Sequence, residues 1–135
     1  MIAFRFSGHK NIAALHPTTL EFTKEHYLSE RGDCILGVDA EYDAEQLKRF
    51  ARDYAGQQAT LTISASGVQD TVQFIVNGGF DHPEEFVIRM GMYDDRRTLG
   101  IRANKAAKHI ARTLITALTQ PSAHGHATLS VVTIK

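Results

Sequence analysis

The chain has 135 residues, and its 15 Lys and Arg balance its 15 Asp and Glu, so the formal net charge at pH 7 is zero. This length fits a single domain over residues 1–135 with a core of its own. A zero net charge excludes the global field that draws basic proteins onto nucleic acids or anionic membranes, so an anion site would have to be a local cluster. The single cysteine and the absence of a signal-like N-terminus or a long apolar run predict a soluble, cytoplasmic protein without membrane partners.

Three short strands are predicted in the first third of the chain. Residues 2–6 alternate apolar and polar side chains, which is the period of a half-buried strand, and Gly8 ends the pattern. A second strand is expected over about 18–23, and the apolar run 34–38 has the length of a third. The polar loop between the second and third strands is therefore expected to be held at both ends.

The middle of the chain predicts a helix and a hairpin. Asp43 is placed to cap a helix that carries an apolar stripe and ends at Gly56. Strong alternation over 59–65 and 68–76, separated by a Ser-Gly turn, predicts two strands paired as a hairpin. A sixth strand is expected over 86–92.

The last third predicts a long helix and a final strand. Asn104 can cap a helix that runs to about Thr119, followed by a linker over 121–126 and a strand over 127–134. Seven mostly alternating strands with two helices favour a mainly β, α+β fold. We expect an antiparallel two-sheet β-sandwich, jelly-roll-like, with two appended α-helices.

Several spaced polar motifs resemble a known family. These are Gly8-His9-x-Asn11, the run His16-x-Thr18-Thr19-Leu20-Glu21, and Arg31-Gly32-Asp33-Cys34, together with His82-Pro83, Val87-Ile88-Arg89 and Arg97-Thr98-Leu99. Together they resemble the uncharacterised, mainly archaeal family called domain of unknown function 371, over most of the chain. Lys10 and Met90-Gly91 depart from its pattern. The resemblance implies a β-rich sandwich and no assigned activity.

The histidines and the cysteine in the first third of the chain are candidates for metal binding and for nucleophilic chemistry. Nitrogen and carboxylate ligands are offered by His9, His16 and His26, with Glu21 and Asp33 nearby. Their spacing matches no known metal signature, and surface histidines are the commoner interpretation. Cys34 shares a strand face with two apolar residues, which favours a buried, unreactive thiol over a nucleophile. No metal ligand set is predicted, and the cofactor is unknown.

A cluster of cations precedes or opens the predicted second helix. The cluster would lie near a helix N-terminus, where the macrodipole disfavours positive charge unless an anion is present; its members are Arg96, Arg97, Arg102 and Lys105. A bound phosphate or carboxylate would compensate for this cost. Surface pairs with Asp94 and Asp95 are an equally weighted alternative.

These observations lead to one hypothesis, in which two polar segments meet at a pocket for a small anionic ligand. The expected catalytic groups, if the protein is an enzyme, are His16, Glu21 and Asp33, which would move protons. The expected ligand-binding residues are His9, Thr18, Arg31, His82, Arg89, Arg97, Arg102 and Lys105. An RNA-binding protein is the less favoured alternative, because no RNA-binding aromatic motif is present, and a structural interaction module is the third.

Overall fold

A computed structural model describes residues 1–29 and 31–131. The described strands form one eight-stranded sheet in the order β1-β8-β4-β5-β7-β6-β2-β3. The strands are β1 (Ile2–Ser7), β2 (Thr19–Thr23), β3 (Ile35–Gly37), β4 (Gln58–Ala65), β5 (Val68–Val76), β6 (Glu85–Arg89), β7 (Thr98–Ile101) and β8 (His124–Val131). The helices are α1 (Ala44–Asp53) and α2 (Arg112–Leu118), with a 3₁₀ turn, η1, at Ala107–His109.

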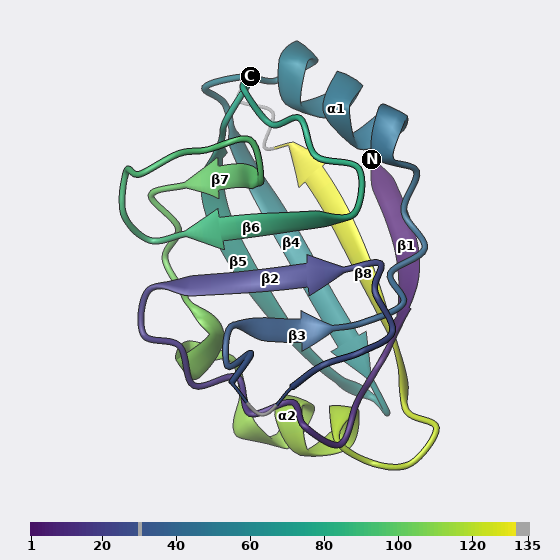
Figure 1. The fold of residues 1–135 in the computed structure, drawn as a ribbon. Coiled ribbons are helices and arrows are strands. Elements are labelled where there is room, and N and C mark those ends of the chain that lie inside the picture. The colour runs from purple at the N-terminus through teal and green to yellow at the C-terminus, as the bar shows by residue number, and fades with distance from the viewer. Residues whose placement is uncertain (30, 132–135) are drawn as a thin grey trace.

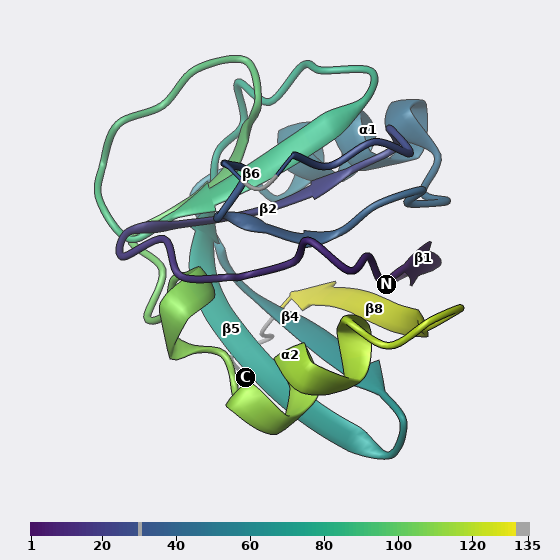
Figure 2. The ribbon, with the colours of Figure 1, turned by 60° about the horizontal axis from the view of Figure 1, so that its bottom comes forward.

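The sheet bends until its two edge strands meet. Figure 1 shows β1, β8, β4 and β5 running steeply behind, while β7, β6, β2 and β3 cross in front of them, and Figure 2 shows α2 lying across one end. Ser7, at the end of β1, and Val38, just after β3, exchange two backbone hydrogen bonds of 2.8 and 2.9 Å. The edges are thus joined at this point, which protects part of the backbone that an open sheet would leave unpaired.

Aromatic rings fill the space between the two halves of the sheet. Phe22 stacks on Phe86 with ring centroids 5.4 Å apart, and Phe4 meets both rings edge-on. The approach of β1 to β3 requires glycine, because a Cβ atom added to Gly37 would lie 2.3 Å from the Phe6 ring. The aromatic core therefore fixes how closely the sheet edges can approach.

Two local predictions are confirmed in detail. The Asp43 side chain accepts a 3.1 Å hydrogen bond from the Gln46 N–H and caps α1, as the sequence pattern indicated. Strands β4 and β5 form the predicted antiparallel hairpin. Ser66 and Gly67 at its turn both have positive φ angles, of 51° and 78°, as the tight hairpin turn requires.

The predicted antiparallel two-sheet sandwich is wrong, although the mainly β, α+β class is right. Strand β2 pairs with β3 in parallel, and β6 pairs with β7 in parallel, within the single mixed sheet. Strand β7 was not predicted, because a four-residue strand carries too little alternation to stand out. The parallel pairs are connected by loops, so the scarcity of helices did not exclude them.

The predicted long helix over 104–119 is also wrong. Ile110 and Ala111 have extended ψ angles of 140° and 125°, which separate η1 from the seven-residue α2. The Asn104 side chain accepts from the Gln73 N–H, and the Asp70 carboxylate accepts a 2.9 Å hydrogen bond from the Ala111 N–H. Contacts with β5 therefore replace continued helix.

The C-terminal part differs from the prediction in a second way. Strand β8 begins at His124, so it includes most of the expected linker's histidine-rich end, and it is described as far as Val131. The predicted last residues of that strand, 132–134, lie outside the described residues. In the described part of the chain, no helix has the length and apolar character needed to cross a membrane.

Candidate functional site

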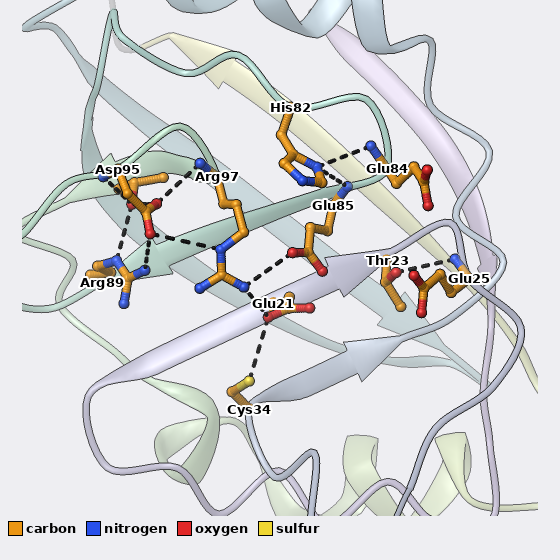
Figure 3. A network of polar contacts seen from close by, with 11 residues as sticks. Glu21, Thr23, Glu25, Cys34, His82, Glu84, Glu85, Arg89, Asp95 and Arg97 are labelled. Carbon is orange, nitrogen blue, oxygen red and sulfur yellow. Dashed lines mark hydrogen bonds and ion pairs between the residues drawn. The ribbon is translucent and has the colours of Figure 1, made fainter.

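The outer face of β2 and β6 carries a polar cluster that we call the carboxyl cluster, made of Glu21, Cys34, Glu85 and Arg97. Leu20 and Phe22 point into the core, so the residues that alternate with them in β2 face outward. The antiparallel register places Thr23 opposite Glu85, which makes Glu21 and Glu85 diagonal neighbours on this face. Figure 3 shows the four side chains gathered there.

Glu21 is the least accessible member of the carboxyl cluster. Only 7% of the residue is exposed. Its Oε1 atom lies 3.6 Å from the Cys34 sulfur, within donor distance for a thiol, and 4.0 Å from Nη1 of Arg97. The same Nη1 atom donates a 3.1 Å hydrogen bond to Glu85 (Figure 3). Arg97 is thus closely paired with Glu85 and only loosely with Glu21.

Burial and a second carboxylate make Glu21 a weaker acid than an ordinary glutamate. Loss of solvent contributes most, the hydrogen bond and the charge of Glu85 add to it, and Arg97 and the Cys34 thiol oppose it, so that the pKa of Glu21 rises to about 7. Two neighbouring carboxyls resist being ionised together. The protonated and ionised forms of this side chain are therefore both populated near neutral pH.

Cys34, expected to be buried with the apolar residues of its strand, is only half-buried just before β3, and its thiol donates toward Glu21. Burial, followed by the charge and hydrogen bond of Glu21 and the charge of Asp33, raises the pKa of Cys34 to about 12. Because the thiolate is the nucleophilic form, this environment suppresses reaction at sulfur. The thiol instead acts as a hydrogen-bond donor that holds the Glu21 carboxyl.

Beside the carboxyl cluster, Asp95 fixes the loop that joins β6 to β7. Its Oδ1 atom accepts from the Thr98 hydroxyl at 2.9 Å and from the Arg97 N–H at 3.0 Å, while Oδ2 lies 3.3 Å from Arg89. Burial acts to raise the pKa of Asp95, but the Thr98 hydrogen bond and the charges of Arg89 and Arg97 hold it below its ordinary value. Arg89 is thereby committed to loop structure, also donating to Thr98 at 3.0 Å.

The two polar segments of the sequence do come together, at Glu21 and Arg97. Among the other predicted residues of the first segment, Asp33 is half-buried and its carbonyl oxygen accepts from the His16 N–H at 3.2 Å. The imidazole Nδ1 of His16 accepts from the N–H of Thr18, itself exposed, and Arg31 is exposed. In the described residues, no side-chain hydrogen bond or ion pair joins His16 or Asp33 to Glu21.

Several other predicted ligand residues make contacts with groups of the chain outside the carboxyl cluster. His9 and His82 each use Nδ1 to accept backbone N–H groups two or three residues later in the chain. Arg102 is exposed with Nε 3.0 Å from the Met92 sulfur. Lys105 lies 2.5 Å from the Asp70 carboxylate.

The helix-terminus argument for an anion at Lys105 is wrong, because α2 begins seven residues later, at Arg112. Of the predicted pairs between cations and acids, that of Asp95 with Arg97 is present, and Asp95 also contacts Arg89, which was not among the predicted partners. Over residues 1–29 and 31–131, no three His, Cys, Asp or Glu side chains are grouped as metal ligands would be.

Sequence reasoning missed Glu85 and Asp95. The signal for Glu85 was available, since it shares the strand parity of Arg89, a residue that was selected. Asp95 was considered only as a surface partner of arginines, because nothing in the sequence shows that its carboxylate also holds Thr98. Both residues gain their roles from contacts across strands.

Comparison with known proteins agrees with the resemblance in the sequence. The sequence model of the family described as "Domain of unknown function (DUF371)" matches residues 4–132. An uncharacterised protein of Methanocaldococcus jannaschii is 40% identical over 121 residues, which cover 84% of this chain and 87% of that protein. The chain belongs to this family of unknown function.

Proposed function

We propose that this family member binds a small carboxylate- or phosphate-bearing ligand at the carboxyl cluster, with Arg97 holding the anion and Glu21 carrying a proton. One observation supports the proposal above all: a buried carboxyl with a pKa of about 7 lies 4.0 Å from a guanidinium whose side chain is 40% exposed. A buried acid of this kind costs folding stability, and shifted pKa values concentrate at functional sites.

Charge decides which anions suit the site. Glu85 and Asp95 remain close to the Arg97 guanidinium, at 3.1 and 3.7 Å, so an arriving anion meets negative charge as well as positive. An ionised Glu21 would add a buried negative charge to this repulsion, and protonation of Glu21 removes that charge. Binding should therefore take up a proton, and a singly charged carboxylate should be favoured over a doubly charged phosphate.

The same proton gives the site its chemical capacity. A carboxyl with a pKa near 7 can both donate and accept a proton under neutral conditions, which is the requirement for general acid–base catalysis. In this proposal the Cys34 thiol orients Glu21 through its 3.6 Å contact and does not attack the ligand. The proposal also keeps His16 and Asp33 as proton carriers near the cluster, joined to each other by the hydrogen bond from the His16 N–H to the Asp33 carbonyl oxygen.

RNA binding is the second candidate and has less support. Arg89, Arg97 and Lys105, which would have to contact phosphates, all lie against carboxylates. Such pairs reduce the counterion release that drives nucleic-acid binding. The strong salt dependence of that mode would distinguish it from a carboxylate pocket.

Calorimetric titration with acetate, phosphate and sulfate tests the proposal. Acetate affinity should fall about tenfold between about pH 6 and pH 8.5 if ionised Glu21 costs about 1.4 kcal/mol of binding. Titration in buffers of different ionisation enthalpy should show proton uptake. Arg97→Gln should abolish binding, whereas Glu21→Gln should keep it and remove its pH dependence.

Arg96→Gln is the matched control, because Arg96 is the adjacent arginine and its contact is with Asp81 at 3.8 Å, outside the cluster. Circular dichroism would confirm that all three variants are folded. Equal loss of acetate binding in the Arg96 and Arg97 variants, or no saturable anion binding to the wild type, would refute the proposal.

A further inference from the structure

The loop between β6 and β7 presents two large apolar side chains to solvent. Met92 is 57% exposed and Tyr93 is 66% exposed, although single exposed apolar residues are ordinary on protein surfaces. Here the two are consecutive, and each touches an arginine: Met92 contacts Arg102, and Tyr93 lies over Arg89. Their placement is therefore organised by neighbouring side chains.

Arg89 orders the Tyr93 ring from one side. The guanidinium carbon lies 4.9 Å from the ring centroid, in the range of a cation–π contact, and Arg89 is itself held by Thr98 and Asp95. A ring ordered in this way loses less conformational freedom when a ligand stacks on it. Its high exposure leaves surface for such a ligand.

Tyr93 is linked to the anion-binding group by a short series of contacts. Arg89 carries the tyrosine ring and lies 3.3 Å from Asp95, and Asp95 lies 3.7 Å from Nε of Arg97. Figure 3 shows Asp95 between Arg89 and Arg97, with dashed lines to both. An aromatic surface and the proposed anion site are thus joined by one series of side-chain contacts.

We infer that the ligand is an aromatic carboxylate, with its carboxylate on Arg97 and its ring stacked on Tyr93. The inference rests on the proposed function and adds the ligand class to it. Aromatic pairs prefer offset or edge-to-face contact, which an exposed ring on a loop can provide, and Met92 adds an apolar sulfur contact of the kind that aromatic rings favour. The ring contact supplies selectivity that Arg97 alone does not.

Titration with a series of carboxylates tests the inference. Acetate, benzoate, phenylacetate and 3-phenylpropionate carry the same charge and differ in the ring and in its distance from the carboxylate. The best aromatic member should bind about five- to tenfold more tightly than acetate. Tyr93→Ala should remove this advantage while leaving acetate affinity within about twofold, since Arg97 is retained.

Tyr27→Ala is the matched control, because Tyr27 is a comparably exposed tyrosine on the loop that follows β2. It should leave the whole series unchanged. If acetate binds through Arg97 but the aromatic members gain nothing, or keep their gain in Tyr93→Ala, this inference is wrong and the proposed function stands. If no carboxylate binding depends on Arg97, the proposed function itself fails and the inference fails with it.

Discussion

Replacing Glu21 by Gln should make the protein more stable at alkaline pH and change it much less at acidic pH. The folded pKa of Glu21, about 7, lies above its ordinary value of 4.5, so the folded state binds the extra proton. The contribution of protonated Glu21 to the free energy of unfolding is fully present below the ordinary pKa. It is lost as the pH rises through the folded pKa. At about 1.4 kcal/mol per pKa unit, the full loss is about 3 kcal/mol.

Urea unfolding of both proteins at several pH values between about 4 and 8.5 measures this effect. The difference in unfolding free energy, variant minus wild type, should increase by about 2–3 kcal/mol across that range. Glu84→Gln, the same change at an exposed neighbour of the cluster, should follow the wild type. Parallel curves for wild type and Glu21→Gln would show that Glu21 titrates like an ordinary glutamate, and the reasoning about its environment would be wrong.

Three further predictions concern the scaffold and the thiol. Leu61→Ala should cost about 2–5 kcal/mol in urea unfolding, because Leu61 is fully buried; a cost below about 1 kcal/mol would contradict its place in the core. Asp70→Asn should cost about 1–2 kcal/mol near neutral pH, because it removes the charge that pairs with Lys105 and that strengthens the Ala111 hydrogen bond. Burial acts to raise the pKa of Asp70, but these contacts hold it below its ordinary value, so the contribution should vanish as the pH of urea unfolding is lowered through the folded pKa; a cost that persists in strong acid would refute this. Cys34 should react slowly with a thiol reagent in the native state and rapidly in urea, because its pKa is raised to about 12; native labelling within seconds would contradict the assignment of an inert thiol.

Elements with strong local signals were predictable from the sequence. The hairpin of β4 and β5 combines clean alternation with a Ser66-Gly67 turn, and α1 combines an Asp43 cap with a full apolar stripe. In each case the contacts that define the element lie within the element itself. Local pattern and final structure therefore agree.

Elements governed by distant contacts were not predictable. The helical spacing over 104–119 is real, but Asp70, 41 residues before Ala111, accepts the N–H at which α2 begins. The parallel pairing of β6 with β7 depends on a loop that Asp95 fixes through Thr98. Asp70 leaves no sign in the sequence window of α2, and the contact of Asp95 with Thr98, three residues later, does not indicate which strand β7 pairs with.

The candidate site divides in the same way. The sequence predicted Glu21 and Arg97 as site residues, from a polar residue on a strand and from a cluster of cations. In the structure, Oε1 of Glu21 and Nη1 of Arg97 lie 4.0 Å apart. Burial raises the Glu21 pKa most, and Glu85 adds to the shift; the parity of Glu85 was readable from the sequence, but its position beside Glu21 follows from the register of β2 on β6. The sequence identified the charged residues, whereas burial and the pairing of β2 with β6 set the pKa of Glu21.

Nuclear magnetic resonance of the Glu21 side-chain carboxyl carbon, followed against pH with and without benzoate, tests the central claim most directly. The claim is that Glu21 carries a proton near neutral pH and that an anion bound to Arg97 raises the pKa of Glu21 further. The signal, assigned by its absence in Glu21→Gln, should titrate near pH 7 and move to higher pH when benzoate is bound, since nearby negative charge favours the neutral carboxyl. Titration near the ordinary value of 4.5, unchanged by benzoate, would contradict the account.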